Sequence, residues 1–213
     1  MGRRKIKRKV WVLPFVTLLA GLGIGFVLSQ IKRPFSASRG CPLEAQAYLK
    51  FKQIKTDFIP QGVPEDYGSE LGISFDRVQE AINKVRVFGP TFGQEGKKII
   101  LVGKDKERYI RIGKQTACRY CCGVDALVKD DGEAACGCAH SIMMRGLAAY
   151  LIKNRPQWSD DKILAELNRW RRTFFPKQTL AAELQRRQRQ GDKEIELIIR
   201  EFPDFLPEMV GGC

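Results

Sequence analysis

The sequence predicts a mainly helical α+β protein with one small β-hairpin, an N-terminal transmembrane helix and a Cys/His knuckle. Three observations support this prediction. Apolar residues recur at helical spacing over much of the chain beyond residue 43. An uncharged stretch follows a strongly basic N-terminus. Five of the seven cysteines and the only histidine fall between Cys118 and His140.

The N-terminus has the composition of a membrane anchor. Residues 1–9 hold six Lys or Arg side chains, whereas residues 10–29 hold no charged side chain. A helix of about 20 residues, rising ~1.5 Å per residue, matches the ~30 Å hydrocarbon core of a bilayer. The excess of positive charge before the span predicts a cytoplasmic N-terminus and an extracytoplasmic domain. Small residues near Ala37 leave open whether the segment is cleaved.

The rest of the chain is expected to form one domain behind a linker. Residues 30–42 are rich in Pro, Ser and Gly and are the predicted linker, and residues 43–213 are the predicted domain, with the Cys/His cluster at 118–140. A chain of 213 residues suits one compact domain plus accessory segments. The formal charge of +13 is partly concentrated in residues 1–9, so it does not indicate nucleic-acid binding.

Helices are predicted where apolar residues recur every three or four positions. They are expected after Leu43, Ser74, Ser141 and Ser159, with one or two more over residues 178–201 broken near Gly191. Each of the three serines is a plausible N-cap, because its hydroxyl can accept a hydrogen bond from a free backbone N–H. Pro156 and Pro176 are expected to stop the third and fourth helices.

Residues 98–112 are predicted to form the hairpin. Residues 99–102 are a short apolar run, Gly-Lys-Asp-Lys can turn the chain, and Ile110 and Ile112 then alternate with a polar residue. A second turn is expected at the Lys-Asp-Asp-Gly sequence of residues 129–132. One group of cysteines follows each of these features.

The cysteines form two groups with the spacing of metal ligands. The sequence reads Cys118-x2-Cys121-Cys122 and, thirteen residues later, Cys136-x-Cys138-x-His140. Thiolate and imidazole are ligands that zinc and copper prefer in proteins. A turn carrying the first group can meet a helix start carrying the second, where the helix dipole stabilises thiolate. We predict a metal site with Cys118, Cys121, Cys136 and Cys138 as core ligands, completed or replaced by Cys122 and His140. Zn is the first choice and Cu(I) the alternative.

Six donors exceed the four that one structural zinc takes. The adjacent Cys121 and Cys122 can hardly both bind one ion in a relaxed geometry, so the excess indicates spare thiols or a second metal ion. Disulfides between the two groups are an alternative in an exported domain. A second alternative to the metal site is thiol–disulfide exchange within a Cys-x2-Cys or Cys-x-Cys pair. Cys41 and Cys213 stand apart and are assigned to no site.

The stretch Ala-Cys-Gly-Cys-Ala-His-Ser at residues 135–141 resembles exported bacterial proteins named for a Pro-Cys-Tyr-Cys-Gly-Cys motif. The likeness covers Cys136 to His140 and the apolar helix behind them. The order of the two cysteine groups differs here, and the proline is missing. The resemblance implies an exported, membrane-associated location and metal or redox chemistry, without a defined reaction.

Together these features predict a membrane-anchored metal-binding protein acting in metal delivery, sensing or assembly of a membrane protein complex. The alternatives are a thiol–disulfide oxidoreductase and an interaction domain whose fold is stabilised by structural zinc or by disulfides. No glycine-rich phosphate loop and no pair of carboxylates on one predicted face is present, so we expect a binding protein rather than an enzyme. Acidic residues interrupt the basic stretch 169–189. This favours a solvated helix face, or one that contacts anionic lipid headgroups, over a face that binds nucleic acid.

Overall fold

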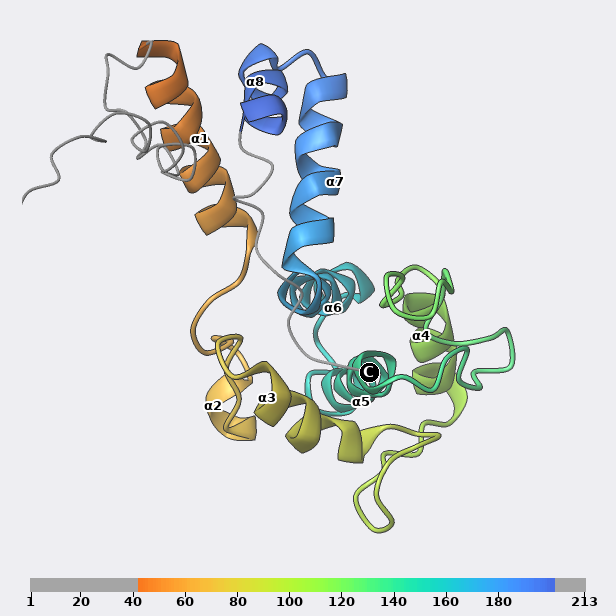
Figure 1. The fold of residues 1–213 in the computed structure, drawn as a ribbon. Coiled ribbons are helices and arrows are strands. Elements are labelled where there is room, and N and C mark those ends of the chain that lie inside the picture. The colour runs from red at the N-terminus through yellow and green to blue at the C-terminus, as the bar shows by residue number, and fades with distance from the viewer. Residues whose placement is uncertain (1–41, 202–213) are drawn as a thin grey trace, which may run out of the picture. The chain divides into compact units, whose positions relative to one another are not determined.

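The computed structural model describes residues 42–201, and these residues are mainly helical (Figure 1). The elements, in chain order, are α1 (Pro42–Phe58), α2 (Gly68–Leu71), α3 (Val78–Val85), the 3₁₀ turn η1 (Arg86–Phe88), α4 (Gly103–Gly113), α5 (Ala139–Asn154), α6 (Asp160–Phe174), α7 (Pro176–Arg189) and α8 (Lys193–Glu201). The helix after Leu43, the Ser159 cap and the break at Gly191 are confirmed.

Helix α5 organises the larger hydrophobic core. Every side chain from His140 to Ile152 is buried, and α5 contacts α3, η1, α4 and α6. Gly146 permits the close approach to α3, because a Cβ at this position would overlap the carbonyl oxygen of Val85. We call this cluster the α5 core. Its position matters for function, because the start of α5 carries the second group of cysteines.

A smaller hydrophobic cluster joins the two ends of the described chain. Helix α1 packs against α8, and α8 packs against α7. The buried members of this α1–α7–α8 core are Ala47, Phe51, Ile54, Leu180, Leu184, Ile195 and Ile198. No cysteine belongs to it among the described residues, so the cysteine cluster depends on the α5 core alone.

The predicted hairpin at residues 98–112 is wrong, and with it the α+β fold class. Residues 103–113 form α4, and within residues 42–201 the only β-type pairing is an isolated antiparallel bridge between Val128 and Ala134. Tyr109, Ile112 and Gly113 are buried on one face of α4, which is a helical repeat rather than an alternating one. The expected turn at residues 129–132 does form: the Lys129 N–H donates to the Glu133 carbonyl oxygen at 2.8 Å.

The predicted single-pass membrane location is corrected as well. Among the residues that the structure describes, no helix has both the length and the apolar character needed to cross a bilayer. The most deeply buried helix, α5, has 16 residues, whereas a span needs about 20. The predicted span 10–29 and the basic segment 1–9 lie outside the described residues. We therefore do not propose a membrane location.

Candidate metal centre

The first group of cysteines lies on a knuckle in the loop that joins α4 to α5 (Figure 1). Two residues in the left-handed region shape it: Arg119 at φ +55° and Gly123 at φ +67°. The Gly123 N–H donates to the Arg119 carbonyl oxygen at 3.1 Å and closes the turn. Arg119 is the only described residue other than glycine with a positive φ. Such conformations persist where the surrounding structure imposes them, often at functional sites.

The second group of cysteines forms the start of α5. Cys138 is the N-cap, and its Sγ accepts a hydrogen bond from the Ser141 N–H at 3.4 Å. Ser141, predicted to be the cap, instead lies buried inside the first turn. The prediction missed because sulfur can take the capping role that serine oxygen usually has. The Cys138 N–H in turn points to Cys136 Sγ at 3.4 Å.

The structure brings both groups together. The sulfur atoms of four cysteines lie within 4.8 Å of one another: Cys118, Cys122, Cys136 and Cys138. A second set of donor atoms, also mutually within 4.8 Å, comes from Cys121, Cys138 and His140. Zinc bound tetrahedrally at ~2.3 Å separates its sulfur ligands by ~3.8 Å. The 3.5 Å between Cys118 Sγ and Cys138 Sγ is close to that spacing. All six candidate donors therefore lie in one cluster, and their role as metal ligands stays a prediction.

Two sulfurs of the cluster are bonded to each other. Cys122 and Cys136 form a disulfide, with Cα atoms 6.7 Å apart. Cys118 and Cys138 carry free thiols beside it, whereas Cys121 is also disulfide-bonded. Because a metal is bound by thiolates, this disulfide must be reduced before all four sulfurs can serve as ligands. The same four residues can therefore exist as a dithiol with a disulfide or as a four-thiolate set.

The hydrogen bond between the two free thiols decides which one ionises first. It lowers the pKa of Cys138, against the effect of burial, and His140 and the Ser141 N–H lower that pKa further. The same hydrogen bond, together with burial, raises the pKa of Cys118. The surroundings therefore favour ionisation of Cys138 before Cys118.

Arg145 is a buried cation next to these sulfurs. Only 1% of the residue is exposed, and its Nη1 donates to the Cys136 carbonyl oxygen at 2.9 Å and to Ser141 Oγ at 2.7 Å. Its Nη2 is buried and has no hydrogen-bond partner. Burial lowers the pKa of Arg145, while the charges of Cys138 and Cys118 raise it. A buried charge without an opposite charge is costly, so this cation favours an anionic cluster.

Arg145 was not predicted from the sequence as part of the site. A single arginine inside the apolar run of α5 was the available signal, because such a residue has to find partners for its charge within the core. His140, by contrast, was predicted as a candidate ligand. It is completely buried, and its ring lies 4.8 Å from the rings of both Phe174 and Phe175.

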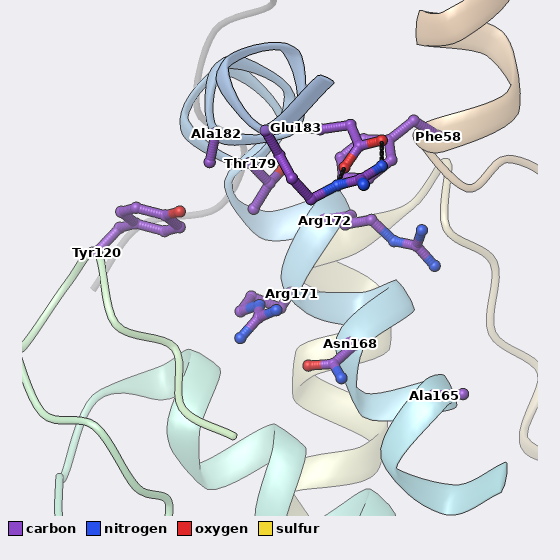
Figure 2. A pocket seen from close by; sticks show the side chains of 10 residues that line it. Phe58, Tyr120, Ala165, Asn168, Arg171, Arg172, Thr179, Ala182 and Glu183 are labelled. Carbon is purple, nitrogen blue, oxygen red and sulfur yellow. Dashed lines mark hydrogen bonds and ion pairs between the residues drawn. The ribbon is translucent and has the colours of Figure 1, made fainter. Parts of the chain in front are cut away.

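A pocket of about 360 Å³ adjoins the knuckle (Figure 2). Tyr120, which lies between two of the cysteines, lines it on one side, and residues of α6 and α7 line the other. Arg171 and Arg172 in its wall are half-buried and make no side-chain hydrogen bond or ion pair with a described residue. Burial lowers the pKa of both. The prediction of a solvated basic face is therefore wrong for these two arginines.

No protein family, curated protein or solved structure matches the chain.

Proposed function

We propose that this protein binds a metal ion through the thiolates of Cys118, Cys122, Cys136 and Cys138 and acts in metal delivery or sensing. The observation that supports this most directly is the convergence of four sulfurs, from two separate segments, within 4.8 Å of one another. Four sulfur ligands at this spacing suit tetrahedral zinc, which is our first choice, and the all-sulfur set also suits Cu(I).

The charge balance around the cluster supports the metal over a fully oxidised state. Arg145 is buried and lacks a carboxylate partner among the described residues. Four thiolates around a divalent ion carry net negative charge, which compensates this cation, whereas disulfides are neutral. Thiolates beside Arg145 are stabilised by the same interaction.

Delivery or sensing is favoured over a purely structural role by the exposure of one ligand. Cys118 is completely buried, but Cys122 is exposed on the knuckle. A ligand at the surface can be replaced by a donor from a partner, which a carrier requires. A structural site is expected to close all its ligands off from solvent.

Elemental analysis combined with a thiol count tests the proposal. Protein purified in a reducing, chelator-free buffer is expected to contain stoichiometric metal and to show cluster cysteines protected from alkylation until a chelator is added. Cys118→Ser should lose the metal, whereas Cys41→Ser, outside the described residues, should retain it. Metal-free protein with freely alkylated thiols under these conditions would reject the proposal.

The Cys122–Cys136 disulfide supports a second candidate, thiol–disulfide exchange. The Cys138 thiolate lies within 4.8 Å of both disulfide sulfurs. Attack on either one would form a new bond to Cys138 and release the other sulfur as a thiolate, so electrons balance without another reactant. This candidate predicts metal-free protein that cycles reversibly in a glutathione redox buffer, as the same thiol count would show.

A further inference from the structure

We propose that the cluster holds a second metal ion, bound by Cys121, Cys138 and His140, with the Cys138 thiolate bridging the two ions. This inference rests on the proposed function, because the bridge requires a first ion in the four-sulfur site. The three donor atoms lie within 4.8 Å of one another, as the four sulfurs of the first site do. Cys138 is the one residue that both sets share.

The two adjacent cysteines divide between the sites. Neighbouring residues of an extended or turning chain cannot easily direct both side chains at one ion. In the structure Cys122 lies in the four-sulfur set and Cys121 in the other, with 3.8 Å between the two sulfurs. Both residues are disulfide-bonded in the structure, so the two sites form only after reduction. The surplus of donors over the four that one zinc takes is thereby explained.

The donors available to the second ion differ from those of the first. The second ion has two sulfur ligands and one imidazole nitrogen, which leaves its fourth tetrahedral position open to an exchangeable ligand. His140 lies in the first turn of α5, and its ring packs against the rings of both Phe174 and Phe175, which restricts its orientation. An ion with an open position is the one that a carrier can transfer.

Charge favours a pair of divalent ions. After reduction, the five cysteines of the two sets carry five negative charges as thiolates, two divalent ions carry four positive charges, and the buried Arg145 supplies one more. The cluster is then neutral. A single divalent ion, or two Cu(I) ions, would leave uncompensated negative charge inside the protein, which is costly.

Titration of the reduced full-length protein with Co²⁺ tests the bridge. Sulfur-to-cobalt charge-transfer absorption should saturate at two equivalents. The electron paramagnetic resonance signal of high-spin Co²⁺ should rise up to one equivalent and fall between one and two, because a thiolate bridge couples the two spins antiferromagnetically. Cys121→Ser and His140→Asn should each saturate at one equivalent with an undiminished resonance signal.

Each outcome separates the inference from the proposed function. Saturation at one equivalent in the wild type overturns the second site and leaves the first. Two equivalents with a signal that grows throughout overturn the bridge. No cobalt binding at all overturns the proposed function together with the inference. Because His140→Asn opens a gap between two rings, Cys121→Ser on the partly exposed knuckle serves as the variant that keeps the fold, and circular dichroism checks both.

Discussion

Arg145 joins the candidate metal centre to the hydrophobic core at the scale of single residues. Its guanidinium holds the carbonyl oxygens of Cys136 and Leu127 and the hydroxyl of Ser141, at distances between 2.7 and 3.3 Å. These three contacts fix the chain just before α5 and the first turn of α5 itself. The same side chain places a buried positive charge beside the cysteine cluster. Groups that orient metal ligands in this way typically change metal affinity by ~10–100-fold.

Arg145→Met is therefore expected to weaken metal binding by at least about tenfold. Methionine fills a similar volume but removes both the charge and the donors to Cys136 and Ser141. Competition with a chromophoric zinc chelator measures the affinity. Arg155→Met, at the other end of α5, removes an ion pair with Glu70 and should leave the affinity unchanged. Equal affinities in the wild type and Arg145→Met would contradict the role given to Arg145.

At the scale of helices and loops, the spacing of apolar residues was a better guide to secondary structure than the turn residues were. Four helices could be predicted from their apolar residues: α1, α3, α5 and α6. Apolar residues lie on one buried face of each helix or, in α5, along almost its whole length. Helix α4 was mistaken for a hairpin because Gly103 before Lys-Asp-Lys is also a turn sequence, and Ile110 and Ile112 fit both patterns over so short a run. The helix rather than the hairpin forms because Tyr109 and Ile112 are buried against α5. A single sequence does not reveal this tertiary contact.

Gly146→Ala tests the close packing of α5. The added Cβ would overlap the Val85 carbonyl oxygen, which is backbone and cannot move aside as a side chain could. We expect the free energy of unfolding to fall by about 1–3 kcal/mol, the usual range for overpacking, despite the better helix propensity of alanine. Urea denaturation measures it. Gly137→Ala, where a Cβ meets open space, is the matched control and should change stability little. A Gly146→Ala protein as stable as the wild type would refute this packing.

Helix α7 carries a pH-dependent contribution to stability through Glu183. Hydrogen bonds from Arg186, opposed by burial and aided by Arg187, lower the pKa of this carboxyl to about 2. Since the pKa in the folded state lies below the unfolded value, the stabilisation is present above about pH 4.3 and is lost as pH falls towards 2. Because Arg186 is half exposed, we expect only about 1 kcal/mol.

Glu183→Gln should accordingly reduce stability at pH 6 and show a smaller further loss on going to pH 3 than the wild type. Urea unfolding at the two pH values measures both effects. Glu107→Gln, an exposed glutamate without an ion pair to a described residue, is the control. Parallel pH profiles for Glu183→Gln and the wild type would show that the ion pairs of Glu183 contribute nothing measurable.

At the scale of the whole described chain, the candidate metal centre belongs to one of two hydrophobic cores. Cys118 is a member of the α5 core, and Cys121 and Cys138 pack against it. The α1–α7–α8 core contains none of the cluster residues. The six candidate donors were predicted from their spacing alone, but their division into two sets sharing Cys138 depends on how the knuckle meets α5. That meeting is a property of the folded chain, so the sequence left one ion, two ions and disulfides open.

Metal removal should therefore loosen one core and spare the other. After chelation, we expect backbone amides at the start of α5 and the end of α4 to exchange with deuterium faster. Amides of α1 and α8 should exchange at their original rates. Hydrogen exchange read by mass spectrometry resolves these peptides, since local opening is reported element by element. Uniform acceleration over both cores would indicate that the centre supports the entire fold.

X-ray absorption at the zinc edge of the reduced, zinc-loaded protein tests most directly whether sulfurs from the knuckle and from the start of α5 share metal. We expect a first shell dominated by sulfur at ~2.3 Å. Cys118 lies on the knuckle and Cys138 at the start of α5. Cys118→Ser and Cys138→Ser should each lower the number of sulfur atoms in this shell. A shell of oxygen and nitrogen alone, or a sulfur count unchanged by either substitution, would contradict the shared site.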